Sequence, residues 1–445
     1  MKAYEFVLRH VAWPLIDLKN HSGRLRELRR LEKTQWQPAT VRAAGQALML
    51  QETIARAARD VPYYRERWDK LPAIRTIADL AQVPLLTKAE VRQHAAALKS
   101  SAFLRDSLIE ARTGGSTGVA LIVHFDDDCQ QKRNAAAYRS NTWAGWKPAM
   151  EAGALWGNAP IARGWREKVR HFLSERLVYL DTVDMSPADI ARFMATLKRK
   201  DIRAIYGHAH SLYMLAVCAQ RDGIEPPSLD AIVSTSMVLL DNERAFIERY
   251  FSCKVTNRYG CEEVGLIASE CEQHDGLHIN DDHLVVEILD EANLPVSPGT
   301  VGKIVVTDLI NHGMPLIRYQ IGDMSSWMEG VCKCGRAMPR LAKVAGRVAD
   351  FLKRGDGRLV AGVSLVERTL TAIPGVDQMQ IVQPAIDDLR LKIVLAKGHD
   401  AQAAGRQLAT VMTEAFGPSV QCTIDFVAAL DQDANGKYRF AICQC

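Results

Sequence analysis

Apolar residues in the first part of the chain recur at a spacing close to that of an α-helix. Leu25, Leu28 and Leu31 show this pattern within the basic stretch His21–Lys33, and similar spacing predicts helices over roughly the first 70 residues. The run Asp60–Tyr64 contains a proline and interrupts the periodicity. The chain is therefore expected to begin with a helical lead-in.

The spacing changes from about Leu108, where short apolar runs alternate with segments of helical periodicity. Repeated strand–helix order predicts α/β layers with largely parallel sheets. Two later runs, His283–Leu289 and Gly302–Asp308, are typical of a more antiparallel region. The expected strands of the first region are Ala120–Phe125, Ala152–Trp156, Ile202–Tyr206, Ala231–Ser234 and Lys254–Asn257, and the expected helices are Gln130–Thr142 and Ser186–Lys200.

A second change comes near Gly346, and about 100 residues beyond it would make one small domain. We therefore expect an α/β protein with a large N-terminal domain of layered mixed sheets and helices, residues 1–345, in which 1–70 form the lead-in. A small mobile α+β domain would occupy 346–445. Its alternating strand and helix patterns are Arg358–Thr371, Met379–Val382, Leu389–Leu395, Ala403–Phe416 and Val420–Val427.

Charge and length narrow the classes of function. The 445 residues carry a formal net charge of +4, which does not indicate the concentrated basic face of a nucleic-acid-binding protein. Charged residues interrupt Met1–Ile16, so it lacks the features of a signal peptide. No apolar run approaches the roughly 20 residues that span a bilayer. These observations favour a cytoplasmic protein without a transmembrane segment.

The basic stretch His21–Lys33 leaves open a weak peripheral contact with an acidic membrane surface. A solvated amphipathic helix is the favoured interpretation, because such charge runs usually face water. The sequence does not determine the oligomeric state, and a homodimer stays open.

A glycine-rich segment, Arg112–Gly118, lies between two apolar runs. Its three glycines allow a close approach of the backbone, and its hydroxyl groups and consecutive N–H groups could converge on a phosphate. It does not match the Walker pattern, because no lysine follows Gly118. On local grounds alone a plain loop is the favoured interpretation.

Four further segments follow in order: Asn257–Glu263, Pro315–Asp323, Gly346–Asp350 and Asn435–Arg439. Together with the glycine-rich loop they resemble, in order and spacing, the motifs of the adenylate-forming superfamily of acyl- and aryl-CoA ligases. The resemblance covers roughly residues 60–440. It is strongest to the phenylacetate–CoA ligase-like branch, which includes proteins linked to capsular polysaccharide biosynthesis.

The resemblance implies that the protein uses ATP to activate a carboxylic acid as an acyl-adenylate, with CoA as the expected acceptor. Glu263 would hold Mg²⁺, since this ion prefers oxygen ligands. Tyr259 and Gly260 would lie near the adenine. The loop residues implied to hold the β- and γ-phosphates are Thr113, Gly114, Gly115, Ser116, Thr117 and Gly118.

The resemblance also assigns residues to the sugar and to the reacting atoms. Asp323 would accept hydrogen bonds from the ribose hydroxyls, and Arg347 would lie near the same sugar at a hinge. Lys437 would bring its positive charge to the carboxylate and α-phosphate as charge develops between them. Glu263 and Lys437 are therefore the expected catalytic residues.

Some positions depart from the family pattern. Val119 and Ala120 stand where the phosphate loop usually continues to a proline, and Glu262 replaces a serine or threonine. Ala349 replaces the first aspartate of the hinge, and Met237 stands where an acidic residue is common. Two alternatives therefore stay open: an adenylating enzyme with a non-CoA acceptor, or a non-catalytic nucleotide-binding homologue.

The acid would need a pocket, and its substrate is a small-molecule carboxylic acid that the sequence does not specify further. Candidate pocket residues by position are Trp156, Tyr206, His208, Ser211 and Ser234–Met237.

A metal site is indicated by the pair Cys332 and Cys334 with an upstream Cys/His segment. Cys271, His278, Cys332 and Cys334 would supply three thiolates and one imidazole, a tetrahedral set that suits structural Zn²⁺. His274 is the alternative nitrogen ligand, because Cys-x-x-His is also a workable spacing. Related ligases of this branch carry a similar cluster.

Overall fold

The structure is a computed structural model of the chain. The residues it describes are 3–20, 22–68, 74–112, 121–156, 164–165, 173, 176–180, 186–344, 351–355, 359–361, 365–366, 369–370, 372–373, 375–396, 398–430 and 441–445.

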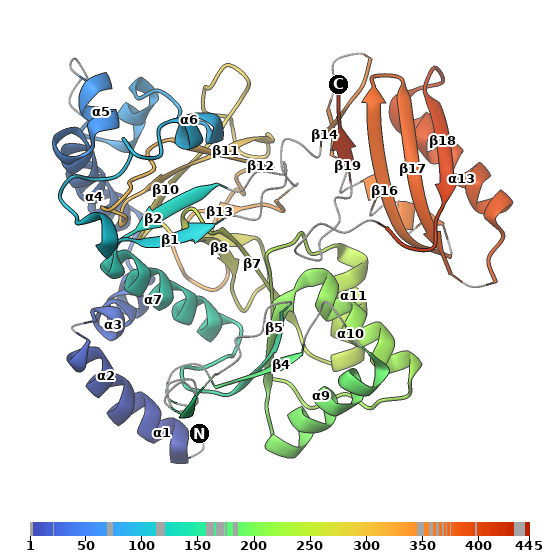
Figure 1. The fold of residues 1–445 in the computed structure, drawn as a ribbon, viewed down its shortest axis with the longest axis horizontal. Helices are drawn as coiled ribbons and strands as arrows, with labels where there is room; N and C mark the ends of the chain where they lie inside the picture. Colours follow the sequence, from blue (N-terminus) through green and yellow to red (C-terminus); the bar gives the residue numbers. More distant parts are fainter. Residues whose placement is uncertain are drawn as a thin grey trace. The chain divides into compact units, whose positions relative to one another are not determined.

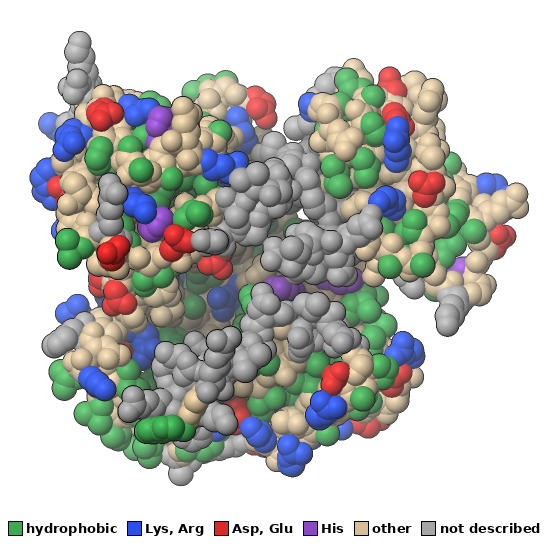
Figure 2. Space-filling view, viewed as in Figure 1, with side chains coloured by type: hydrophobic (Ala, Val, Ile, Leu, Met, Phe, Trp, Pro, Cys, Tyr) green, Lys and Arg blue, Asp and Glu red, His purple; other side chains and the backbone are tan. Residues whose placement is uncertain are grey.

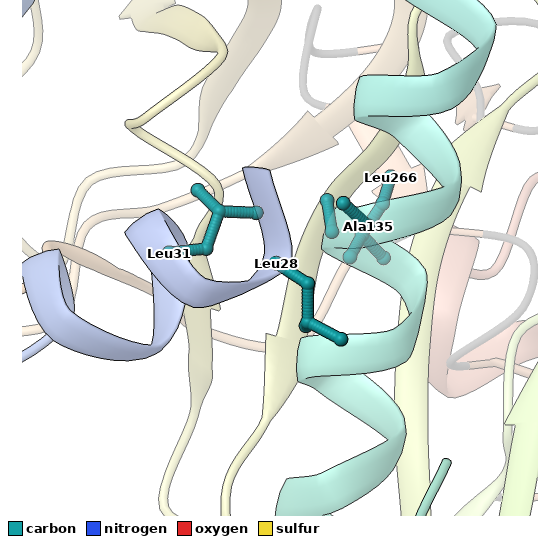
Figure 3. Packing of buried hydrophobic residues seen from close by; sticks show 5 residues of the cluster. Leu28, Leu31, Ala135 and Leu266 are labelled. Carbon is teal, nitrogen blue, oxygen red and sulfur yellow. The ribbon is translucent and has the colours of Figure 1, made fainter. Parts of the chain in front are cut away.

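The lead-in is helical, as predicted (Figure 1). The predicted break is confined to Val61, which is extended with φ −109° and ψ 112°. Leu28 and Leu31 are buried against Ala135 and Leu266, so the basic helix packs its leucines on the body of the protein (Figure 3). The elements are α1 (Ala3–Val7), the π-helical turn η1 (Leu8–Ala12), α2 (Trp13–Lys19), α3 (Arg24–Thr34), α4 (Ala39–Asp60) and α5 (Pro62–Arg67).

An eight-stranded sheet with the order β13-β9-β8-β7-β6-β5-β3-β4 forms the centre of the larger part of the chain. Neighbouring strands are parallel along the run β4-β3-β5-β6-β7, as predicted. They are antiparallel along the rest of the sheet, β7-β8-β9-β13. The strands are β3 (Ala152–Leu155), β4 (Leu177–Leu180), β5 (Ala204–His208), β6 (Ala231–Thr235), β7 (Val255–Cys261), β8 (Gly265–Glu270), β9 (Leu277–Ile279) and β13 (Arg340–Leu341).

Helices connect the parallel strands and cover the sheet. Ser186 accepts a hydrogen bond from the N–H of Asp189 and caps the predicted helix before β5. The apolar face of that helix is buried, with Phe193, Met194 and Leu197 under 5% exposed. The helices are α7 (Asp127–Trp143), α9 (Pro187–Lys200), α10 (Ala209–Arg221) and α11 (Asp241–Phe251).

Two smaller sheets complete this part. The antiparallel strands predicted at residues 283–289 and 302–308 are confirmed and pair as neighbours. The first sheet contains β10 (Leu284–Leu289), β11 (Gly302–Asp308) and β12 (Tyr319–Ser325); the second contains β1 (Ile109–Arg112) and β2 (Ile122–Phe125). Short helices lie at η2 (Ile77–Gln82), α6 (Lys88–Gln93) and η3 (Arg105–Ser107).

The C-terminal region has its own sheet, with the order β18-β17-β16-β19. Its apolar side chains form a core in which Ile381, Leu391, Leu408 and Met412 are fully buried. The elements are β14 (Phe351–Lys353), β15 (Leu359–Ala361), β16 (Val376–Ala385), β17 (Asp388–Leu395), α13 (Ala401–Phe416), β18 (Gln421–Phe426) and β19 (Ala441–Cys443).

The chain divides into two compact units. The larger contains Met1–Met237, Phe246–Ile321 and Ser325–Lys343, and the smaller contains Val238–Ala245, Gly322–Met324 and Val344–Cys445. The domain boundary at residue 345 stays a prediction.

Candidate active site

Part of the predicted site lies outside the described residues, and its roles stay predictions. These residues are Thr113, Gly114, Gly115, Ser116, Thr117, Gly118, Arg347 and Lys437. The hinge residue Ala349 and the loop residues Val119 and Ala120 also lie there.

The turn between β7 and β8 holds Glu263. A Cβ on Gly260 would lie 2.6 Å from the carbonyl oxygen of Gly265, so the close approach of the two strands requires glycine. Arg133 of α7 closes the turn: its Nη2 donates to the carbonyl oxygen of Glu263 at 2.8 Å and to Oδ2 of Asp308 at 2.9 Å. Arg133 therefore ties the backbone at Glu263 to Asp308 of β11.

The Glu263 carboxylate is 3% exposed and has two polar neighbours. The Tyr319 hydroxyl donates to Oε1 at 3.1 Å, and Nζ of Lys88 lies 3.5 Å from the same oxygen. Burial, together with the negative charge of Glu263, raises the pKa of Tyr319, so the hydroxyl keeps its proton and donates. Both contacts use Oε1, so among the described residues Oε2 stays available to a ligand.

Lys88 is a site residue that the sequence reasoning missed. It is the first residue of α6, whose capping box joins Thr87 and Glu90: the Thr87 hydroxyl accepts from the N–H of Glu90 at 3.2 Å. The N–H of Leu86 donates to the carbonyl oxygen of Arg318, and the N–H of Gln320 donates to the carbonyl oxygen of Leu86, each at 2.9 Å. These bonds hold the segment beside β12. The Thr-x-x-Glu signature could have located the helix start, but not its neighbour.

Two further predicted nucleotide-binding residues are described. Tyr259 is half-buried on β7, opposite Ala268 of β8. Asp323 is 9% exposed on β12 and follows Gly322, whose φ of +92° favours glycine. The preceding arginine of that motif, Arg318, is structural, because its guanidinium donates to Glu287 at 2.8 and 3.0 Å.

Three of the predicted pocket residues come together at the carboxyl end of the parallel strands, where open α/β sheets bind ligands. The Trp156 ring lies 4.3 Å from His208 and 6.0 Å from Tyr206, measured between centroids. The Trp146 ring stacks on the Tyr206 ring, with 5.3 Å between their centroids. Ser234 is fully buried at the end of β6. Ser211 lies in the first turn of α10, and Met237 follows β6.

Arg258, on β7, is a second site residue that the sequence patterns did not indicate. Its Nη1 donates to Oδ1 of Asn141 at 2.7 Å, while its buried Nε has no hydrogen-bond partner among the described residues. Burial lowers the pKa of Arg258 to about 10, and the neighbouring Tyr206 opposes this shift. The guanidinium stays charged at neutral pH and faces a neutral amide in place of a carboxylate.

The four predicted metal ligands come together. The sulfur atoms of Cys271, Cys332 and Cys334 and a ring nitrogen of His278 all lie within 4.8 Å of one another. Cys271 Sγ is 3.7 Å from Cys332 Sγ, and Cys334 Sγ is 3.4 Å from His278 Nε2. Sulfurs bound tetrahedrally at about 2.3 Å to zinc would be about 3.8 Å apart, so the set has the size of a zinc site.

The surroundings of the cluster suit a metal. The backbone N–H groups of Gln273 and Arg336 each donate to a cysteine sulfur at 3.4 Å, as the outer partners of thiolate ligands do. Burial lowers the pKa of His278 to about 4 and keeps the imidazole neutral. The alternative ligand His274 instead lies beside Glu270, with Nδ1 3.3 Å from Oε2.

Comparisons with known proteins find related sequences. Residues 352–444 match the CapK C-terminal domain family. The chain is 26% identical over 367 residues to phenylacetate-coenzyme A ligase of Thermus thermophilus, covering 78% of this chain and 80% of that protein. It is 23% identical to protein CapK of Staphylococcus aureus, covering 82% and 81%.

A solved structure is also similar. The crystal structure of 2-hydroxyisobutyryl-CoA ligase in the postadenylation state, in complex with R3-HIB-AMP, superposes with a TM-score of 0.75 at 20% identity, over 92% of this chain and 91% of that one. The chain is thus a homologue of the phenylacetate-coenzyme A ligases and CapK and has the fold of the adenylate-forming acyl-CoA ligases, as its motifs predicted.

Proposed function

We propose that this protein is an ATP-dependent, AMP-forming acid–CoA ligase, which activates a carboxylic acid as an acyl-adenylate and transfers the acyl group to the thiol of CoA. The observation that carries the proposal is the buried Glu263 carboxylate, held on one oxygen by Tyr319 and Lys88. The contact with Tyr319 joins two of the motif segments in this homologue of CoA ligases.

The chemistry requires this arrangement, because the acid and the α-phosphate that it attacks are both anionic. Glu263 would hold Mg²⁺ through its second oxygen, and the ion would neutralise phosphate charge. Tyr259 would lie near the adenine and Asp323 near the ribose. Arg347, Lys437 and the loop at residues 113–118 would complete the site by resemblance. A cytoplasmic location would supply ATP and CoA.

The acid is proposed to bind at the aromatic cluster of Trp156, Tyr206 and His208. Arg258 gives that region a buried positive charge with a neutral protein partner, and burying a charge is costly unless it is paired. We infer that Arg258 binds the carboxylate of the acid. The aromatic rings would then contact its organic part.

The Cys/His cluster is proposed to bind structural Zn²⁺. Its four protein ligands would leave no open position for a substrate or water, which distinguishes a structural site from a catalytic one. The metal would join β9 to the segment at 332–334 and so support the sheet that carries Glu263.

The deciding experiment is ATP–pyrophosphate exchange with the full chain, screened against aryl, fatty and amino acids. In the presence of its matching acid, an active enzyme transfers label from pyrophosphate into ATP. When CoA is added, it forms the acyl-CoA. Adenylate formation without acyl-CoA would favour the non-CoA acceptor. ATP binding without exchange for any acid in the panel would favour the non-catalytic homologue.

A further inference from the structure

The first helical stretch of the chain, α1 to α2, has an inner face that packs on the body of the protein. Leu8 and Trp13 are 4% and 3% exposed and contact Tyr138 and Ala149. Nε1 of Trp13 donates to the carbonyl oxygen of Leu173 at 2.8 Å, and its ring stacks on Tyr138 at 5.4 Å. The stretch is therefore anchored to the larger unit.

The outer face of the same stretch is also apolar. A surface helix normally presents polar side chains on the face opposite its core contacts. Here Val7, Val11, Leu15 and Leu18 follow one another at spacings of four, four and three residues and are 52%, 48%, 59% and 73% exposed. Phe6 adds a further exposed ring, 52% exposed. A contiguous exposed apolar patch of this kind marks an interaction surface.

Three of the four acidic side chains described between residues 3 and 36 are buried, and the fourth, Glu32, is half-buried. Glu5, Asp17 and Glu27 are 8%, 7% and 8% exposed. Asp17 accepts from Arg24 Nη2 at 3.1 Å and from the backbone N–H of Leu25 at 2.9 Å, and Glu27 lies 2.7 Å from His283. Among the described residues from 3 to 36, no aspartate or glutamate is exposed.

Basic side chains remain on the outside. In Figure 2 hydrophobic and basic side chains are both visible over α1 and α2, at the lower left. The exposed bases of α2 and α3 are Lys19, Arg26, Arg29, Arg30 and Lys33. We call the apolar residues of α1 to α2 and these bases the N-terminal face.

We propose that the N-terminal face binds the surface of an anionic phospholipid bilayer. An amphipathic helix lies in the plane of such a surface, with its apolar side chains at the boundary between headgroups and acyl chains and its bases on the phosphates. No helix of the described chain is long and apolar enough to cross a bilayer, so the contact is peripheral. The proposal is independent of the ligase reaction.

Charge favours a bilayer over a second copy of this chain. A two-fold dimer would place the same patch of both subunits together and would bring two sets of exposed bases close to each other without intervening carboxylates. Like charges that are brought close together repel. An anionic membrane satisfies the apolar and the basic parts of the surface together.

The test is co-sedimentation of the full chain with vesicles of phosphatidylcholine, either alone or mixed with phosphatidylglycerol. We expect binding to the mixed vesicles that falls as salt is added. The triple variant V11S/L15S/L18S should lose at least about tenfold in vesicle affinity, since it removes the apolar contacts. Its fold should survive because these side chains already face water.

The matched control is L294S/V301S, which changes two side chains that are 59% and 50% exposed elsewhere on the same unit. It should bind vesicles as the unchanged protein does. Equal binding to neutral and anionic vesicles, or none to either, would overturn the proposal. A dimer that the triple variant dissociates, seen by light scattering without vesicle binding, would instead identify a second copy as the occupant.

Discussion

The hydroxyl of Tyr319 donates a hydrogen bond of 3.1 Å to Oε1 of Glu263, although 56 residues separate them in the chain. Tyr319 is fully buried, and Glu263 lies in the turn after β7. The bond therefore fixes the orientation of the proposed Mg²⁺ ligand from a different sheet. It leaves the second carboxylate oxygen for the ion.

Removing the Tyr319 hydroxyl should loosen the Glu263 carboxylate. A hydrogen bond to a charged group contributes about 1.5–3 kcal/mol, so Tyr319→Phe should raise the Mg²⁺ concentration needed for pyrophosphate exchange by roughly tenfold or more. Glu263→Gln should raise it further. A Mg²⁺ titration of the exchange rate measures both.

The control for that pair is Tyr250→Phe. It also removes a hydroxyl of the larger unit, one that donates to the carbonyl oxygen of Ile224, without touching Glu263. Its Mg²⁺ dependence should be unchanged. Identical curves for Tyr319→Phe and the unchanged protein would contradict the role given to Tyr319.

Lys437 is predicted to act on the reacting atoms and not on ATP binding. Lys437→Ala should slow adenylate formation by orders of magnitude, because a positive charge is lost where negative charge develops. ATP should still bind, as measured by calorimetry. Exchange at the unchanged rate would show that the assignment of this lysine is wrong.

Strong periodicity in the sequence predicted helices and strands well. It did not predict site residues whose role depends on contacts between distant segments. The antiparallel strand Gly302–Asp308 was predicted with its observed bounds. Lys88 and Arg258 could not be recognised, because their importance comes from Glu263 and Asn141, which other elements bring to them. Spacing alone treats such residues as ordinary surface or strand positions.

The metal candidates show the same limit. Cys-x-x-His spacing kept His274 open as the alternative to the predicted nitrogen ligand His278. In the fold, His278 of β9 pairs with Arg340 of β13 and lies beside the cysteines, whereas His274 has a φ of +51° and lies beside Glu270. The strand pairing that separates them joins residues about 60 positions apart, which local patterns do not encode.

Zinc removal should destabilise the larger unit. We expect about one equivalent of zinc in protein purified without chelator, and a fall in Tm of roughly 5 °C or more after chelation or in Cys332→Ser. Cys253→Ser, outside the cluster, should change neither value. Under roughly 0.2 equivalents of zinc by elemental analysis would exclude the four-ligand site.

Glu27 should make stability depend on acid pH. Burial alone would raise its pKa, but hydrogen bonds from Arg30 and His283 outweigh burial and lower the pKa from 4.5 to about 2. Stability from this group is therefore present above pH 4.5 and is lost as pH falls towards 2, by at most about 3 kcal/mol. Urea midpoints measured between pH 5 and 3 should fall less steeply in Glu27→Gln.

Glu52→Gln is the comparison for that series. Glu52 also pairs with an arginine, at 2.7 Å, but its side chain is 57% exposed, and solvent screens such pairs. Its pH slope should match that of the unchanged protein. If Glu27→Gln shows the same slope as well, the buried pair does not contribute as described.

Arg258 should determine how tightly the acid binds. Within the part of the chain that the structure describes, its charge has only the amide of Asn141 as a hydrogen-bond partner. An incoming carboxylate would supply a counter-charge. Arg258→Gln should raise KM for the acid by roughly tenfold to a hundredfold, with KM for ATP nearly unchanged. Arg203→Gln, which breaks an exposed pair with Asp230, should leave both constants as they are. Equal increases in the two KM values for Arg258→Gln would show that the guanidinium stabilises the sheet and does not bind the acid.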